Sequence, residues 1–269
     1  MITKSKSPIG VFDSGLGGLT VLTELEKILP NESFIYYGDT AHVPYGSKSV
    51  NTIIRYSRNI IEFFMIHNAK AVVIACNTAS AVAFPEIRSC YDTPLFDVVM
   101  PSVVHSNTIS KTRKIGVIGT HSTIFSRAYT QSFTNLKSDC SVIEISCPLF
   151  VPLIEEGWTN TPVAKQVAHS YLKPFKKTEI DTLILGCTHY PIMAKTIQEA
   201  VESHVQLVFS GKTVGDILVS YLEKNRFKND SELPGKTKFY VSDLPQKFDE
   251  LGSRFLKRKI EHVEHIPLW

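Results

Sequence analysis

Short apolar runs alternate with longer segments of helical periodicity along most of this chain. The run 71–75, Ala-Val-Val-Ile-Ala, carries no charge and precedes a segment at 78–89. Such a run predicts a strand buried on both faces of a parallel sheet. In the segment 50–68, isoleucine and phenylalanine recur at the spacing of an amphipathic helix. The alternation predicts an α/β protein with mainly parallel sheets.

The same criteria place the other elements. Further strands are expected at 9–12, 33–37, 95–98, 115–118, 142–145, 182–185, 205–208 and 237–241. Further helices are expected at 18–29, 102–109, 122–134, 161–176, 191–201, 212–224 and 244–258. A new α/β series begins near residue 102, and no low-complexity linker separates it from the first. We therefore predict one domain at 1–98 and 210–269 and a second domain at 99–209.

Composition narrows the class of protein. The 269 residues are 43% hydrophobic and 20% charged, with a mean hydropathy of +0.00 and a net charge of +3. This charge is too small to indicate nucleic-acid or membrane binding. The basic cluster 254–259 lies at helical spacing from Glu261 and Glu264, which predicts a solvated helix face. With no secretory signal, no membrane span and no Cys-x-x-Cys among five cysteines, a reducing cytoplasm is expected.

Cys76 and Cys187 occupy the same local setting far apart in the sequence. Each follows a predicted strand and precedes residues suited to a helix N-terminus, Asn77 and Thr78 in one case and Thr188 in the other. The positive end of a helix dipole favours a thiolate, so both thiols are expected to be activated. The other three cysteines, at 90, 140 and 147, are interpreted as packing residues.

The likeness extends upstream of both cysteines. Pro8-Ile-Gly-Val-Phe-Asp-Ser14 resembles Lys114-Ile-Gly-Val-Ile-Gly-Thr120, and each precedes its cysteine strand in the same order. Ligands bind at the carboxyl ends of strands in open α/β sheets. Two similar halves with one thiol each predict a single cleft with an acid/base group on each wall.

Three further side chains are candidates for chemistry. Asp13 ends the first strand, where it could cap a helix or hold a substrate ammonium group. His189 lies two residues after Cys187 and is a plausible proton partner for it. Glu155 follows an apolar stretch and could face a cleft or solvent; its spacing does not decide between them.

Cofactor motifs are incomplete in this sequence. After Gly15 and Gly17, the dinucleotide fingerprint requires glycine where Thr20 stands. The segment 211–213, Gly-Lys-Thr, lacks the earlier glycine of a phosphate loop, since Gln206 is there. No His-Glu-x-x-His or similar ligand set occurs. We therefore expect neither a nucleotide cofactor nor a catalytic metal.

Four motifs together resemble the bacterial glutamate racemases. They are Asp13-Ser-Gly-Leu-Gly-Gly18, Pro44-Tyr-Gly46, Ala75-Cys-Asn-Thr-Ala-Ser80 and Leu185-Gly-Cys-Thr-His-Tyr-Pro191, and the likeness extends through Phe239-Tyr-Val-Ser-Asp243. The resemblance implies two pseudo-symmetric, three-layer α/β domains that face each other across a cofactor-independent active site. One departure is visible: many members carry Asp where this chain has Phe209.

The resemblance also implies an activity, the interconversion of L- and D-glutamate by two cysteine bases. Cys187 would deprotonate L-glutamate and Cys76 would deprotonate D-glutamate, with Asp13 near Cys76, and His189 and Glu155 near Cys187. D-glutamate is a building block of peptidoglycan. The residues implied to hold substrate are Asp13, Ser14, Tyr45, Gly46, Asn77, Thr78, Thr120, Thr123, Thr188 and His189.

Other functions remain open. The nearest alternatives are an aspartate racemase, a hydantoin racemase or a maleate isomerase, which also use paired cysteines. Alternatives from different classes are a thiol redox protein, against which the absence of Cys-x-x-Cys weighs, and a non-catalytic amino-acid-binding or partner-binding protein, against which the intact polar residues at both turns argue. The expected partner is a small-molecule substrate, L- or D-glutamate. No membrane or nucleic-acid partner is expected, and a homodimer is left open.

Overall fold

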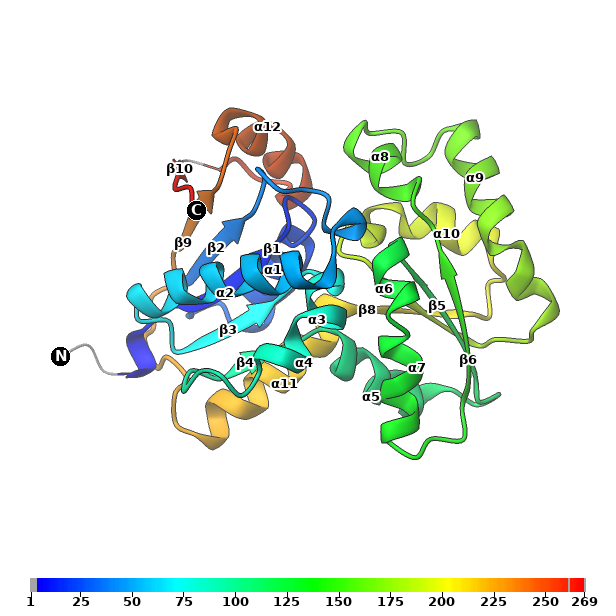
Figure 1. The fold of residues 1–269 in the computed structure, drawn as a ribbon, viewed down its shortest axis with the longest axis horizontal. Helices are drawn as coiled ribbons and strands as arrows, with labels where there is room; N and C mark the ends of the chain where they lie inside the picture. The colour runs from blue at the N-terminus through cyan, green and yellow to red at the C-terminus, as the bar shows by residue number, and fades with distance from the viewer. Residues whose placement is uncertain (1–3, 261, 269) are drawn as a thin grey trace.

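The computed structural model describes residues 4–260 and 262–268, which form two parallel sheets flanked by helices (Figure 1). The first sheet has the strand order β10-β9-β2-β1-β3-β4, and the second has the order β6-β5-β7-β8. All the strand pairs that the described residues form are parallel. The prediction of an α/β fold with mainly parallel sheets is therefore confirmed.

The strands of the first sheet come from both ends of the chain. They are β1 (Ile9–Asp13), β2 (Phe34–Gly38), β3 (Ala71–Ile74), β4 (Leu95–Phe96), β9 (Thr237–Val241) and β10 (Val263–His265). The second sheet is built from the middle of the chain by β5 (Lys114–Gly119), β6 (Ser141–Ser146), β7 (Thr182–Gly186) and β8 (Gln206–Phe209). The domain boundaries at 98/99 and 209/210 stay a prediction, although no strand of either sheet crosses them.

Helices cover the sheets. They are α1 (Leu19–Ile28), α2 (Val50–Ile66), α3 (Asn77–Val82), α4 (Phe84–Ile87), α5 (Val99–Ile109), α6 (His121–Phe125), α7 (Ala128–Asn135), α8 (Phe150–Glu155), α9 (Pro162–Leu172), α10 (Ala194–Ala200), α11 (Ser210–Lys224) and α12 (Pro245–Leu256). Short 3₁₀ helices are η1 (Lys4–Lys6), η2 (Tyr45–Ser47), η3 (Lys173–Lys177) and η4 (Tyr190–Met193).

Apolar packing joins the two halves. One face of the first sheet packs against α1 and α11, and one face of the second packs against α8, α9 and α10. A third cluster is continuous between the halves, because Phe12 and Ile74 of the first sheet share it with Ile115 and Ile184 of the second. Helix α11 packs against α1 and against α5, and it starts where the two halves meet (Figure 1).

The strand order explains how distant motifs meet. Strand β1, which ends at Asp13, lies directly beside β3, which leads to Cys76. Strand β5 lies in the same way beside β7, which leads to Cys187. Because parallel strands end at the same edge of a sheet, each cysteine turn shares its edge with a second polar turn.

Several expected helices are broken. The segment 122–134 is divided into α6 and α7 at Arg127, whose φ is 57°. The segments 78–89, 161–176 and 191–201 are each divided into two shorter helical elements. Two of the breaks coincide with prolines, Pro85 at the start of α4 and Pro174 at the start of η3, so the sequence carried a signal for them.

The predicted helix face at 254–259 is exposed to solvent, as expected, but only its first part is helical. Helix α12 ends at Leu256, and Lys257 is left-handed with φ 53°. Glu264 lies in strand β10, which pairs with β9, while Glu261 lies outside the described residues. The pairing of a three-residue strand depends on a distant partner, so local charge spacing carried no signal for it.

Candidate active site

The first cysteine turn forms where β1 and β3 end side by side. Cys76 is the N-cap residue of α3, and its thiol donates a hydrogen bond to Ser14 Oγ at 3.6 Å. Ser14 is the residue that follows β1. The expected strand-to-helix placement of Cys76 is therefore present, with Ser14 as its neighbour.

The ionisation of Cys76 differs from the expected thiolate. Burial and the nearby carboxylate of Asp13 raise the pKa of Cys76 to about 12, although hydrogen bonds with Ser14 and Ala79 oppose the rise. Helix α3 has only six residues, so its dipole does not offset the loss of solvation. At neutral pH Cys76 is a protonated thiol, ready to give a proton.

The second cysteine turn follows β7. Cys187 is 5% exposed, and the chain continues through Thr188 and His189 into η4. His189 Nε2 lies 3.1 Å from Glu155 Oε1, which α8 brings to this turn. The structure thus places Glu155 beside His189, whereas its position in the sequence did not decide between a cleft and solvent.

His189 is held in its charged form. Burial acts to lower the pKa of His189, but hydrogen bonds with Cys187 and Glu155 outweigh burial and raise it to about 10. The negative charge of Asp13 contributes in the same direction. The two cysteine turns are therefore electrostatically unlike, despite their similar sequences.

Asp13 lies between the two turns and contacts both halves. Its Oδ2 accepts a hydrogen bond from the backbone N–H of Gly15 at 3.1 Å, and its Oδ1 accepts one from the Thr188 hydroxyl at 3.3 Å. Burial raises the pKa of Asp13, and the charge on His189 partly offsets this rise. Asp13 is thus a fully buried carboxylate beside the imidazolium of His189.

A group of three threonine hydroxyls lies across the boundary between the halves. Thr78 Oγ1 lies 2.9 Å from Thr120 Oγ1 and 3.2 Å from Thr123 Oγ1. Thr120 and Thr123 are themselves 2.9 Å apart, and Thr120 caps α6. Hydroxyls can each donate one hydrogen bond, so this group is suited to an anionic ligand group.

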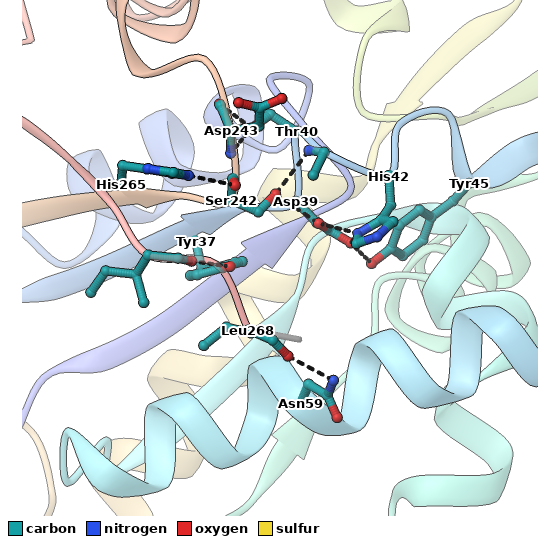
Figure 2. Close-up of polar contacts among 12 residues, drawn as sticks. Tyr37, Asp39, Thr40, His42, Tyr45, Asn59, Ser242, Asp243, His265 and Leu268 are labelled. Carbon is teal, nitrogen blue, oxygen red and sulfur yellow. Dashed lines mark hydrogen bonds and ion pairs between the residues drawn. The ribbon is translucent and has the colours of Figure 1, made fainter.

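The predicted loop residues Tyr45 and Gly46 contribute differently. The Tyr45 side chain is 1% exposed, and its hydroxyl donates to Asp39 Oδ2 at 2.6 Å (Figure 2). The carbonyl of Gly46 accepts a hydrogen bond from Ser122 Oγ at 2.6 Å. A Cβ at Gly46 would lie 3.1 Å from Thr120 Cβ, so glycine allows the loop to approach the second half closely. It is the backbone of this loop that reaches the threonine group.

Asp39 links this loop to the C-terminal part of the chain. Its carboxylate also accepts hydrogen bonds from Ser242 Oγ at 2.8 Å and lies 3.0 Å from His42 Nδ1 (Figure 2). The carbonyl of Ser242 lies 2.9 Å from His265 Nε2, in strand β10. Asp39 is fully buried. The Asp39 carboxylate therefore connects Tyr45, a predicted substrate-binding residue, to Ser242 at the end of β9 and, through Ser242, to β10.

The centre of the site is closed to solvent. Asp13, Asn77, Cys76, Cys187 and His189 are each at most 5% exposed. Contacts between the halves close it, including a hydrogen bond from Thr20 Oγ1 to the Thr188 carbonyl at 2.7 Å. These side chains therefore lie in the interior, where contacts between the two halves surround them.

Sequence reasoning missed several residues of the site. Asp39 directly follows the strand β2, the same kind of position that drew attention to Asp13, so a signal was present. Tyr129 and Ser210 both contact the Asn77 amide, but neither lies in a motif or beside a cysteine. Their sequence separations from Asn77 are 52 and 133 residues, and only the folded chain brings them together.

Two features of the described residues bear on possible membrane and metal partners. No helix within 4–260 and 262–268 is both long and apolar enough to cross a membrane. Within the same residues, no group of three or more His, Cys, Asp and Glu side chains is arranged to hold a metal ion. All five cysteines fall in this part of the chain and are free.

Comparison with known proteins defines the class. Residues 9–214 match the family model described as Asp/Glu/Hydantoin racemase. The chain therefore belongs to this racemase family.

Within the family, several relatives that match nearly the whole chain are named glutamate racemases. The protein of that name from Syntrophus aciditrophicus is 42% identical over 261 residues, covering 97% of each chain. The glutamate racemase from Francisella tularensis, solved in complex with D-glutamate, superimposes with a TM-score of 0.91 at 38% identity, covering 98% of each chain. The one from Thermus thermophilus, solved with β-chloro-D-alanine, gives 0.90 at 39% identity, covering 99% of each.

Proposed function

We propose that this protein is a glutamate racemase, an isomerase that interconverts L- and D-glutamate with two cysteine bases and no cofactor. The observation that carries the proposal is the pair of unlike cysteine turns in one buried site. Cys76 is a thiol of raised pKa, and Cys187 has the imidazolium of His189 as its neighbour. Glutamate is proposed as the substrate because the proteins that match nearly the whole chain are named glutamate racemases.

Inversion at the α-carbon needs one base and one acid on opposite faces. The Cys187 thiolate takes the α-proton of L-glutamate, which leaves a carbanion and a neutral Cys187 thiol. The Cys76 thiol then gives its proton to the opposite face, which yields D-glutamate and a Cys76 thiolate. The reverse reaction exchanges the two roles, and protons balance in both directions.

The resting protonation state suits one direction. A protonated Cys76 and an imidazolium beside Cys187 are the forms that act on L-glutamate. Burial removes water from both thiols, which strengthens the electrostatic effect of His189 and Asp13 on the reacting groups. The reaction of D-glutamate requires the proton to have moved from Cys76 to Cys187.

The polar groups divide naturally between the charges of glutamate. Asp13 is the buried carboxylate that suits the ammonium group, and the hydroxyls of Thr78, Thr120 and Thr123 suit a carboxylate. Ser14, Thr188, and the backbone of Tyr45 and Gly46 complete the set. Because these donors are fixed, a substrate one methylene shorter leaves some of them unpaired, so aspartate should be rejected by roughly 10⁴-fold.

The proposed setting follows from this chemistry. D-glutamate supplied by the enzyme would enter peptidoglycan and so support cell-wall synthesis and cell shape. Two reduced thiols are needed for catalysis, and all five cysteines are free, which favours the cytoplasm. The site has both thiols within one chain, so a homodimer, if it forms, is not needed to complete it.

The direct test is the loss of the circular dichroism signal of L-glutamate on addition of the purified protein. Activity should survive a metal chelator and the carbonyl reagent hydroxylamine, but not a thiol alkylator. Matched Cys90→Ala protein, which lacks only an exposed cysteine, should remain active. Loss of activity with the chelator and recovery with added metal would contradict the proposal, as would comparable turnover of aspartate.

A further inference from the structure

The Asn77 side chain is held at its nitrogen end by two hydroxyl groups. Asn77 Nδ2 donates to Tyr129 Oη at 3.0 Å and to Ser210 Oγ at 3.1 Å. The Ser210 hydroxyl in turn donates to the carbonyl of Leu185 at 3.4 Å. Since the Ser210 proton is used in this way, its oxygen is left to accept from Asn77. Both N–H groups of the amide are therefore occupied.

The other end of the same amide is an unused acceptor. Asn77 is 2% exposed, and its Oδ1 has no hydrogen-bond partner among the described residues. A buried acceptor without a partner is costly, so it marks a position where a donor is expected. Asn77 directly follows Cys76, which places this oxygen in the first cysteine turn. The donor that the proposed substrate offers is its ammonium group.

Tyr129 connects the two cysteine turns. Its ring is fully buried, and its hydroxyl contacts Asn77, the residue after Cys76. On the other side, a Cβ at Gly186 would lie 3.2 Å from Tyr129 Cε2, and Gly186 directly precedes Cys187. Tyr129 comes from α7 of the second half, and Ser210 begins α11 at the predicted domain crossing. The orientation of the Asn77 amide thus depends on how the two halves are closed.

We propose that Tyr129 and Ser210 are positioning residues that fix the Asn77 amide with its oxygen toward the substrate ammonium, so that ammonium recognition requires the closed arrangement of both halves. The inference rests on the proposed racemase function and adds two residues to its site. Neither hydroxyl touches the reacting atoms; each acts through Asn77.

The test uses Tyr129→Phe and Ser210→Ala, singly and combined. Without the hydroxyls of Tyr129 and Ser210, the Asn77 amide is no longer held in one orientation. Its nitrogen can then take the place of its oxygen next to the substrate. The double variant should show kcat/KM for glutamate reduced by about tenfold, mainly through a higher KM. Tyr37→Phe and Thr196→Val are matched controls, because each removes a buried hydroxyl bonded to a backbone carbonyl away from Asn77. The controls should stay within twofold of wild type.

A second measurement separates positioning from general damage. Glutarate has both carboxylates of glutamate but no ammonium group. The inhibition constant of glutarate should therefore be unchanged in the double variant while the KM for glutamate rises. Equal weakening of both ligands, or a double variant with wild-type kcat/KM, would overturn the inference and leave the racemase function intact. A wild-type protein that does not racemise glutamate would instead overturn the function on which the inference rests.

Discussion

Thr188, in the second half of the molecule, donates a hydrogen bond to the carboxylate of Asp13, in the first half, at 3.3 Å. Thr188 follows Cys187 directly, and Asp13 adds to the effect of burial in raising the pKa of Cys76. A single contact therefore joins the surroundings of both thiols. The acid/base site is therefore assembled by contacts between the two halves.

Gly17 permits these contacts. A Cβ on Gly17 would lie 2.3 Å from both His189 Nδ1 and Thr188 Oγ1. We predict that Gly17→Ala displaces the second cysteine turn and lowers kcat/KM by about 10²-fold, since small misplacements of reacting groups have effects of this size. Steady-state racemisation of L-glutamate measures the loss.

Gly15→Ala is the comparison for this variant. A Cβ on Gly15 would lie 3.3 Å from Val43 Cγ2 and contacts no side chain of the second half. It should cause a clearly smaller loss of activity. Equal effects of the two substitutions, with both proteins folded by circular dichroism, would show that the close approach of Gly17 to His189 is unimportant.

The charge of His189 should set the alkaline limit of activity. Its pKa is raised from 6.5 to about 10, so the imidazolium persists at neutral pH and is lost as the pH rises through 10. We predict that racemisation of L-glutamate declines over that range. The stability contributed by His189 should be complete below about pH 6.5 and disappear as the pH approaches 10, because the folded protein binds this proton more tightly.

Removal of Glu155 tests the cause of that shift. Glu155→Gln removes a charged partner of His189, so the pKa of His189 should fall and the alkaline decline should begin at lower pH. Glu156→Gln, which changes the exposed neighbouring carboxylate, should leave the pH profile unchanged. If racemisation by wild type and by Glu155→Gln declined over the same alkaline pH range, the activity would not depend on the charge of His189.

Asp39 should act through the loop that carries Tyr45 and Gly46. Asp39→Asn keeps the shape of the side chain but replaces one acceptor oxygen by a donor, which faces the hydroxyl of Tyr45 or Ser242. We predict a higher KM for glutamate with a smaller change in kcat, and a loss of roughly 1–3 kcal/mol in the free energy of unfolding. Kinetics and urea denaturation give the two quantities.

Asn59→Ala is the matched control for Asp39→Asn. It removes the hydrogen bond from Asn59 Nδ2, on α2, to the Leu268 carbonyl at 2.9 Å. This contact also involves the C-terminal part of the chain but lies apart from Asp39 (Figure 2). The substitution should alter stability slightly and leave KM unchanged. If Asp39→Asn also leaves KM unchanged, the buried carboxylate serves stability alone.

The sequence was most informative where the residues of the site directly follow a buried, continuously apolar strand. Buried strands are continuous apolar runs, so the ends of β1, β3 and β7 and the polar turns after them could be predicted. The break at Arg127 and the short strand β10 could not, because their causes are a left-handed backbone residue and a distant pairing. Burial also reversed the expected ionisation of Cys76, since a sequence shows a helix start but not the loss of water around a thiol.

The most direct test of the account uses glutamate that carries a leaving group on its β-carbon. Loss of the α-proton then expels that group, so the rate of its release reports proton removal by one thiol, without the second. Cys76→Ala retains Cys187, and should release the group mainly from the L-enantiomer. Cys187→Ala retains Cys76, and should release it mainly from the D-enantiomer, while neither variant racemises glutamate. The same enantiomer preference in both variants, or near wild-type racemisation by either, would contradict a mechanism with one thiol on each face of the α-carbon.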